Sequence, residues 1–295
     1  MIKVQNICKT LGTTLAVNDV SFDVTAGEIL GLLGPNGAGK TTTLNMLVGI
    51  LQPDGGTVRI NEGNPCDAGT RHYLGIAPQG LSLYEELTAQ ENLTFLGQLY
   101  GLSAGHLRDR VHEMLEFAAL TDRRKHPVRT YSGGMKRRLN MAAALIHDPE
   151  VVVFDEPTVG VDPQSRNHIF DRIEELKKNG RTIVYTTHYM EEAQRLCDRV
   201  AVMDHGRILA MDTLGGLLTT YGGAAIVKGE LEPDCQLAAC PGVEADRSFR
   251  FSTNEPVREV VRLSESGVAF KALQINQPDL EAVFLSLTGR SLRDD

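Results

Sequence analysis

The sequence predicts an α/β fold with an inserted helical block, followed by a second, small α+β domain. Over roughly the first 210 residues, short apolar runs alternate with helical patterns, which is typical of a sheet with crossover helices. Between Tyr84 and Ile146 the pattern changes to helices only. Beyond a Thr/Gly-rich stretch at Thr219–Gly223, which we interpret as a linker, strand-like and helical segments return.

The length and composition are those of a globular protein of about two domains. The chain has 295 residues, of which 42% are hydrophobic and 23% are charged, and such values suit a packed core. We therefore expect a first domain at 1–218, containing a helical subdomain at about 84–146, and an accessory domain at 224–295.

Charge and apolar run length exclude two roles. Lys and Arg number 30 against 38 Asp and Glu, a net charge of −8, so we expect no nucleic-acid partner, because phosphate backbones attract basic surfaces. No apolar run exceeds six residues, whereas a membrane-spanning helix needs about 20. The first ten residues also lack the apolar core of a secretory signal.

In the first domain, apolar runs predict the strands. These are Glu28–Leu33, Arg71–Ala77, Val151–Phe154, Thr182–Thr186 and Arg199–Met203. Val151–Phe154 is an apolar run that ends in acids, which suits a buried parallel strand. Helices are predicted at Thr41–Val48, Pro163–Lys178 and Met190–Leu196, and the second of these has proline at its start and Gly180 just past its end.

In the second domain, three strand-like segments surround one helix. The segments are AAIVKG, FRFST and VAFKALQI, with a helix at Pro256–Ser266 between the last two. A terminal helix is predicted because four apolar residues recur at helical spacing, namely Leu280, Val283, Phe284 and Leu287. We expect this apolar face to belong to the core of the small domain.

A phosphate-binding motif lies between a predicted strand and a predicted helix. Gly34-Pro-Asn-Gly-Ala-Gly39-Lys40-Thr41 fits the P-loop pattern G-x-x-x-x-G-K-[ST]. Its glycines let backbone N–H groups turn toward phosphate oxygens, and the helix N-terminus adds a positive dipole. Lys40 can reach the β- and γ-phosphates, and the Thr41 hydroxyl can ligate Mg²⁺. The predicted nucleotide contacts are Gly34, Pro35, Asn36, Gly37, Ala38, Gly39, Lys40, Thr41 and Thr42.

Two acids follow the apolar strand Val151–Phe154. A P-loop needs an acidic partner for its metal at the end of a neighbouring strand, and Asp155 is placed for this role. Glu156, the next residue, is predicted to orient or deprotonate the attacking water.

The segment Tyr131-Ser132-Gly133-Gly134-Met135, here called the signature segment, opens a helix and so offers a second anion-binding geometry. Two such elements are redundant for one nucleotide unless they serve two nucleotides across a dimer. Together with the P-loop and Asp155-Glu156, the segment resembles the ATP-binding-cassette ATPases over about residues 1–215. Tyr131 replaces the leucine usual in that family, and Met135 replaces the usual glutamine.

This resemblance implies a P-loop NTPase cassette with a mixed sheet core, with ATP and Mg²⁺ as cofactors. Gln79 matches the glutamine that touches the metal, so Thr41, Gln79 and Asp155 form the implied metal set. His188 matches the switch histidine on the γ-phosphate, which makes Glu156, His188 and Gln79 the implied catalytic set. Asp162 matches an aspartate at the dimer seam, where Tyr131, Ser132, Gly133 and Gly134 would meet the partner's nucleotide.

The family usually stacks an aromatic residue on adenine about where KTLG stands in this chain, which has Leu11 there. Stacking on a base is worth about 1–3 kcal/mol, so a looser grip on the base is expected. Leu11 and Val17 are expected to pack on the base instead.

The segments YSGGMKRRL, DEPTVGVDP, TTHYMEEA and LEAVFLSLTGR resemble the subgroup that pairs with separate ABC-2 type permeases and includes the daunorubicin-resistance and sodium-extrusion ATPases. The resemblance implies an ATP-hydrolysing subunit that powers export through such a permease. It further implies a dimer of identical or different cassettes and a cytoplasmic location on the inner face of the cell membrane.

Two other classes stay open. A soluble cassette ATPase acting on ribosomes or DNA usually carries two tandem cassettes or long coiled coils, whereas this chain has one P-loop and no heptad run. A regulatory subunit that binds nucleotide without turnover would not need Glu156 and His188, which are both present.

Overall fold

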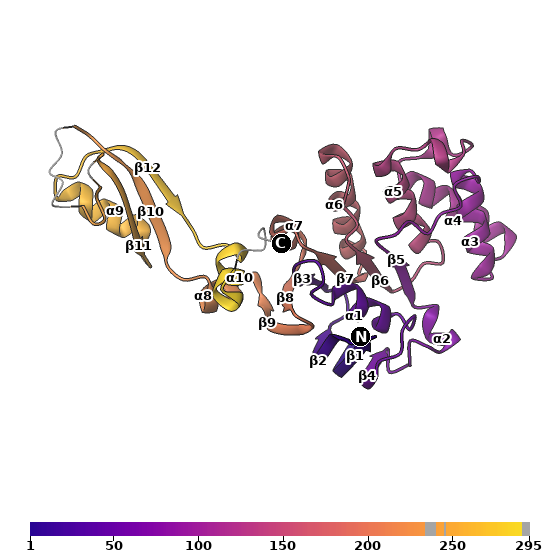
Figure 1. The fold of residues 1–295 in the computed structure, drawn as a ribbon. Helices are drawn as coiled ribbons and strands as arrows, with labels where there is room; N and C mark the ends of the chain where they lie inside the picture. The colour runs from indigo at the N-terminus through magenta and orange to yellow at the C-terminus, as the bar shows by residue number, and fades with distance from the viewer. Residues whose placement is uncertain (234–239, 245, 291–295) are drawn as a thin grey trace. The chain divides into compact units, whose positions relative to one another are not determined.

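The computed structural model describes residues 1–233, 240–244 and 246–290, and these fall into two units (Figure 1). The first unit is Met1–Thr213 and the second begins at Leu214. The segment Thr219–Gly223, interpreted above as a linker, is in large part helical, because α8 covers Leu214–Tyr221. That interpretation was wrong: Leu217 is fully buried and α8 packs on the last helix, so burial outweighs the weak helix propensity of threonine and glycine.

A six-stranded mixed sheet forms the centre of the first unit (Figure 1). Its strand order is β5 (Leu74–Ala77), β6 (Val151–Asp155), β7 (Thr182–Thr187), β3 (Ile29–Leu33), β8 (Arg199–Asp204) and β9 (Arg207–Thr213). The first five strands are parallel, and β9 runs antiparallel to β8. The predicted mixed α/β core is thus confirmed. Strand β5 starts three residues later than predicted because Arg71 ends the short helix α2 (Ala68–Arg71).

Alternate residues of the central strands enter two different cores. Val152 and Phe154 of β6 pack in one core with the helical block, whereas Val151 and Val153 pack in the other with α1 (Lys40–Leu47). Both faces of β6 are therefore buried, which explains its unbroken apolar sequence.

A three-stranded antiparallel sheet, β2-β1-β4, covers the second core. Its strands are β1 (Ile2–Leu11), β2 (Thr14–Val24) and β4 (Gly55–Ile60). Ile2 pairs with Val24 on one side and with Ile60 on the other. This sheet was not predicted from the sequence, although buried and exposed residues alternate at the start of β1.

Helices alone fill the chain between β5 and β6, as predicted. They are α3 (Ala89–Leu99), α4 (Ala104–Phe117) and α5 (Gly133–Ala144), with short 3-10 turns at Thr121–Arg123 and Val128–Thr130. The later helices α6 (Pro163–Lys178) and α7 (Met190–Leu196) have the predicted bounds. The side chain of Asp162 accepts a hydrogen bond from the Ser165 N–H (2.9 Å) and so caps α6.

The second unit is a three-stranded antiparallel sheet, β11-β10-β12, with helix α9 on it. The elements are β10 (Ala225–Leu231), β11 (Ser248–Thr253), α9 (Pro256–Glu265), β12 (Phe270–Asn276) and α10 (Leu280–Thr288). The predicted apolar face of α10 is largely interior, since Leu280, Val283 and Phe284 are buried and α10 packs on α8. Within the described ranges, no helix is long and apolar enough to cross a membrane.

Candidate nucleotide-binding site

Four parallel strands of the first unit end beside one another in the sheet, and each is followed within two residues by a predicted site residue. Gly34 follows β3, Gln79 lies two residues beyond β5, Glu156 follows β6 and His188 follows β7. In open α/β sheets, ligands bind at the carboxyl ends of the strands. A cavity of about 590 Å³ lies here, lined by Thr14, Leu15, Ala16, Asn36, Gly37, Gly39, Lys40, Thr41, Thr42, Gln79, Glu156, His205 and Gly206.

The P-loop is closely packed against neighbouring backbone. Gly39 has φ +99°, and a Cβ atom there would stand 2.5 Å from the Ala16 carbonyl oxygen. A Cβ atom at Gly34 would stand 2.1 Å from the Met203 carbonyl oxygen, so both positions require glycine. Lys40 Nζ donates hydrogen bonds to the carbonyl oxygens of Gly34 (2.7 Å) and Pro35 (2.9 Å), which holds the loop in a closed curve.

The Asp155 carboxylate, next to Glu156 in the chain, receives two hydroxyl hydrogen bonds. Thr41 Oγ1 donates to Asp155 Oδ2 (2.9 Å), and Thr186 Oγ1 donates to Asp155 Oδ1 (2.6 Å). Asp155 is buried. A hydroxyl oxygen and a carboxylate oxygen this close together are the kind of donor set that Mg²⁺ takes in nucleotide sites.

The buried Glu156 carboxylate is the point on which three other predicted residues converge. Lys40 Nζ lies 3.1 Å from Glu156 Oε1. Gln79 Nε2 donates to Glu156 Oε2 at 3.3 Å. His188 Nδ1 also lies 3.3 Å from that oxygen, although it is not aligned for a hydrogen bond.

The backbone of Glu156 is in the left-handed region, with φ +46°. This conformation is uncommon for a residue with a Cβ atom and is typical of functional sites. The Glu156 N–H donates to Thr186 Oγ1 (2.9 Å), so one hydroxyl of β7 holds both Asp155 and Glu156.

The signature segment lies outside this cavity. Ser132 caps α5, where its Oγ accepts from the Met135 N–H (3.3 Å), and the hydroxyl of Tyr131 donates to the Arg123 carbonyl oxygen (2.7 Å). Gly134 lies against the start of α6, because a Cβ atom there would stand 3.1 Å from Asp162 Oδ1. The signature segment and Asp162 are therefore neighbours, away from the P-loop cavity of the same chain.

The residues expected to pack on the base are not those that line the cavity. Val17 is fully buried in the core (0% exposed), which rules out the expected contact with the base. Leu11 is 46% exposed but does not line the cavity, whereas Leu15, 48% exposed, does. Leu11 pairs with Thr14 across the β1–β2 turn, so the hairpin presents Leu15 to the site.

His205 and Gly206, which were not predicted from the sequence, also line the cavity, from the turn between β8 and β9. Gly206 has φ +76°, and a Cβ atom there would stand 2.7 Å from the Ala16 carbonyl oxygen. The signal for this turn is Asp204-His205-Gly206 between two apolar runs, but the strand after it was not predicted.

This fold and this site define a nucleotide-binding cassette, and the chain belongs to the ABC transporter family, whose model matches residues 17–159. It is 40% identical to the linearmycin resistance ATP-binding protein of Bacillus subtilis (strain 168), over 100% of both chains. It is 41% identical to Nod factor export ATP-binding protein I of Ralstonia nicotianae, over 100% of this chain and 95% of that one.

Solved cassettes share the fold. An ATP-binding subunit of an ABC transporter matches with a TM-score of 0.69 and 31% identity, over 75% of this chain and 93% of that one. A dimeric cassette in a post-hydrolysis state, bound to ADP and Pi, matches with a TM-score of 0.66 and 28% identity, over 72% and 99%. The chain is thus an ATP-binding and hydrolysing subunit of an ABC transporter of the export type. Cassettes of this family dimerise and work with transmembrane permeases.

Proposed function

We propose that Lys40, Asp155, Glu156, Gln79 and His188 form the hydrolytic site of this exporter subunit. The observation that supports this most is the convergence of Lys40, Gln79 and His188 on the Glu156 carboxylate. In this proposal Lys40 neutralises the β- and γ-phosphates, and Glu156 orients the attacking water and takes its proton. His188 contacts the γ-phosphate from the end of β7.

Mg²⁺ is part of the same proposal. The Thr41 hydroxyl and the Asp155 carboxylate, 2.9 Å apart, would hold the ion together with Gln79. When bound, it would neutralise charge on the β- and γ-phosphates. The chain's own contribution is to hold the Asp155 carboxylate in place through the Thr41 and Thr186 hydroxyls.

We further propose that two cassettes enclose two ATP molecules, each held by one P-loop and by the partner's signature segment. The separation of the two elements within one chain supports this, because Tyr131, Ser132, Gly133, Gly134 and Asp162 do not line the P-loop cavity. ATP binding would close the dimer, and hydrolysis at Glu156 would reopen it. The base would lie against the β1–β2 hairpin, where Leu15 lines the cavity and Leu11 does not.

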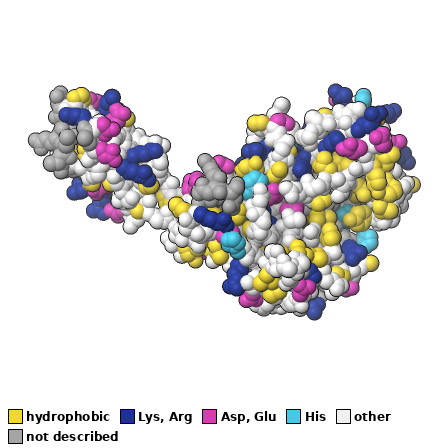
Figure 2. Space-filling model, in the orientation of Figure 1, with side chains coloured by type: hydrophobic (Ala, Val, Ile, Leu, Met, Phe, Trp, Pro, Cys, Tyr) yellow, Lys and Arg dark blue, Asp and Glu magenta, His cyan; other side chains and the backbone are white. Residues whose placement is uncertain are grey.

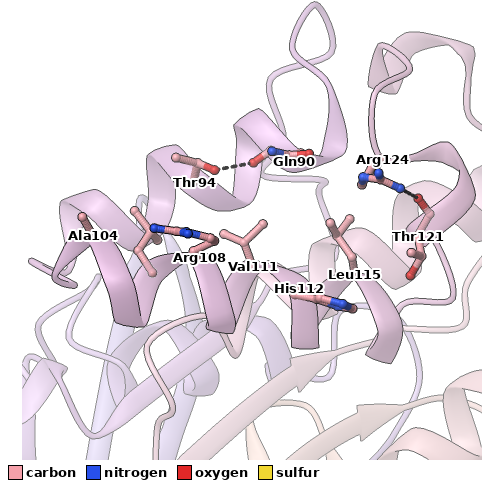
Figure 3. A pocket seen from close by; sticks show the side chains of 10 residues that line it. Gln90, Thr94, Ala104, Arg108, Val111, His112, Leu115, Thr121 and Arg124 are labelled. Carbon is pink, nitrogen blue, oxygen red and sulfur yellow. Dashed lines mark hydrogen bonds between the residues drawn. The ribbon is translucent and has the colours of Figure 1, made fainter.

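An ABC-2 type permease is the proposed membrane partner, and the helical subdomain is the proposed docking region. Side chains of α3 and α4 surround a cavity of about 640 Å³ (Figure 3), with Leu107, Val111 and Leu115 among its lining. Figure 2 shows hydrophobic side chains gathered over α3, where Phe95 and Leu99 are exposed. An amphipathic helix of the permease fits such a surface. Docking there would hold the subunit at the inner face of the cell membrane.

Glu156→Gln tests the hydrolytic assignment, because the amide keeps the shape of the side chain but cannot take a proton. ATP binding and phosphate release are measured on the purified subunit. We expect binding to persist and turnover to fall by about 100-fold or more. Glu265→Gln, at an exposed glutamate of the second unit, is the matched control and retains wild-type turnover. Near wild-type turnover in Glu156→Gln would contradict the assignment.

A further inference from the structure

A second buried carboxylate lies behind the proposed hydrolytic site. Glu192 of α7 is 2% exposed, and its oxygens accept three hydroxyl hydrogen bonds. Thr158 Oγ1 donates to Oε1 (2.6 Å), while Tyr185 OH and Thr187 Oγ1 each donate to Oε2 (2.8 Å). Arg166 Nε lies 3.9 Å from Oε1. Burying a carboxylate is costly unless hydrogen bonds satisfy it. Three hydroxyl groups are committed to satisfying Glu192, which indicates a role of this cluster beyond packing.

The cluster and the proposed hydrolytic site lie on opposite faces of one strand. Successive side chains of a strand point to opposite faces. Tyr185 and Thr187 of β7 bind Glu192, whereas Thr186 between them binds Asp155 and the Glu156 N–H. The end of β7 is therefore held from both sides by carboxylates.

Thr187 connects this cluster to the turn that carries His188. The Thr187 hydroxyl donates its hydrogen bond to Glu192, which leaves its lone pairs to accept a hydrogen bond from the Tyr189 N–H (2.9 Å). This bond closes the turn that carries His188. The Tyr189 ring packs on the His188 ring with centroids 4.1 Å apart, and the Arg166 guanidinium lies 5.2 Å from the Tyr189 centroid.

Thr158 connects the cluster to the loop that follows Glu156. Thr158 is buried in the loop that joins Glu156 to Asp162, the cap of α6. The loop is tightly turned, since the Val159 N–H donates to the Glu156 carbonyl oxygen (3.3 Å) and the Val161 N–H donates to that of Thr158 (3.2 Å). One carboxylate thus joins the loop of the proposed base to the turn of the proposed switch histidine.

We propose that Glu192 is a positioning residue for ATP hydrolysis, whose buried carboxylate holds the turn bearing His188 and the loop from Glu156 to Asp162 in one arrangement. The proposal rests on the roles proposed above for Glu156 and His188. Since Asp162 and the signature segment are neighbours, Glu192 also joins the hydrolytic site to the face proposed to meet the second cassette.

The experiment compares Glu192→Gln with Glu191→Gln, the same change at the exposed neighbour on α7. An amide group has one oxygen and an NH₂ that cannot accept, so at least one of the hydroxyls bound to Glu192 loses its acceptor. We expect kcat of Glu192→Gln to fall by about 10- to 100-fold, the cost of a small misplacement of reacting groups. KM for ATP should stay within about threefold, because the phosphate cradle is untouched. Glu191→Gln should match wild type in both.

A second pair separates positioning from plain stability. Thr187→Val and Tyr185→Phe each remove one hydrogen bond to the same oxygen, Glu192 Oε2. The Tyr185 hydroxyl also interacts with the Thr158 side chain, but only the Thr187 hydroxyl bonds to the turn that carries His188, where it accepts from the Tyr189 N–H. Both variants should lower the melting temperature, and Thr187→Val should lower kcat more than Tyr185→Phe does. This pair decides the matter even if Glu192→Gln does not fold.

Wild-type kcat in folded Glu192→Gln, or equal kcat losses in Thr187→Val and Tyr185→Phe, would overturn the inference. Glu156→Gln is measured in the same series. If Glu156→Gln is inactive while Glu192→Gln turns over normally, only the proposed role of Glu192 is contradicted. If Glu156→Gln turns over normally, the assignment of Glu156 as the base is contradicted instead.

Discussion

Lys40 and Glu156 form a buried ion pair, with 3.1 Å between Nζ and Oε1 and side chains only 4% and 6% exposed. Lys40 is the proposed phosphate ligand and Glu156 the proposed base, so without nucleotide each neutralises the other. An incoming γ-phosphate competes with Glu156 for the ammonium group. Binding of the γ-phosphate to Lys40 would thereby free the Glu156 carboxylate from its ion pair.

This pair predicts that Lys40→Ala loses stability as well as ATP binding. Removing one partner leaves the other charge buried and unpaired, which costs about 3–5 kcal/mol. Urea unfolding without nucleotide measures the loss. The double variant Lys40→Ala/Glu156→Gln should recover much of it, because no unpaired charge then stays buried. Equal stability of the single and double variants would contradict the pairing.

The sandwich arrangement predicts ATP-dependent dimerisation, most visible in Glu156→Gln, where the closed state accumulates. Gel filtration with light scattering, with and without Mg-ATP, measures the mass. The double variant that adds Lys40→Ala serves as the control and should stay monomeric with ATP. A Glu156→Gln protein that binds ATP yet stays monomeric at every concentration, also with the permease present, would count against the sandwich.

The hairpin geometry predicts which leucine contacts the base. Leu15→Tyr should add a stacking surface in the cavity and lower KM for ATP by about fivefold or more, since base stacking is worth about 1–3 kcal/mol. KM for GTP should fall alike, because every base has a π-face, and wild-type protein should hydrolyse GTP at a substantial fraction of its ATP rate. Leu11→Tyr, on the same hairpin but outside the cavity lining, should leave both KM values unchanged. The opposite result would restore Leu11 as the base contact.

His147 predicts a pH-dependent loss of stability. Burial lowers its pKa to about 4, the hydrogen bond to Leu74 O opposing this in part. Leu74 O only accepts, so the neutral ring donates from Nε2 (2.9 Å). His147 is therefore protonated below about pH 6.5 in the unfolded chain but only below about pH 4 in the folded chain. Because protonation favours the unfolded chain between these values, the folded state loses stability as the pH falls through this window.

Between pH 7 and pH 5 this loss is at most about 2 kcal/mol for one histidine. His147→Phe keeps a ring against Tyr100, on which His147 stacks at 3.6 Å, and removes the titration. Chemical unfolding of both proteins at the two pH values measures the difference. The stability of wild type relative to the variant should decline toward pH 5; a pH-independent difference would refute the shift.

If the helical subdomain is the docking region, a substitution on its surface should weaken binding to the permease and leave ATP hydrolysis unchanged. Leu99→Glu places a charge on α3 at a residue that is 68% exposed, so folding and the ATPase activity of the isolated subunit should be unchanged. Copurification with the permease should fall about tenfold or more, because a buried unpaired charge costs several kcal/mol at an interface. Ile50→Glu, equally exposed but outside the helical subdomain, is the control. Equal retention by both variants would move the docking region elsewhere.

Much of the chain could be predicted because the deciding interactions are local. Helix α6 begins at a proline after a capping aspartate and ends before Gly180, signals that act over a few residues. Strand β6 reads as one apolar run because both of its faces are buried. The P-loop glycines lie between β3 and α1, so motif and context agree.

Long-range pairing decided what the sequence did not show. Leu15 and His205 reach the cavity only because β2 pairs with β1 and β9 pairs with β8. Val17, two residues from Leu15 on the same strand, is instead buried in the core. Neighbouring sheets, rather than local propensity, determine which side chains of a hairpin face a ligand.

Two adjacent glutamates show most clearly what the local sequence determines and what tertiary packing determines. Glu191 and Glu192 are the same residue type, next to each other at the start of α7, and both suit the first turn of a helix. Glu191 is exposed, whereas Glu192 is 2% exposed and accepts three hydroxyl hydrogen bonds. Its partners come from the end of β7 and from the loop after β6. The sequence by itself determined the helix and its charges; only packing of α7 against these segments determined which carboxylate is buried, because burial depends on neighbours distant in the chain.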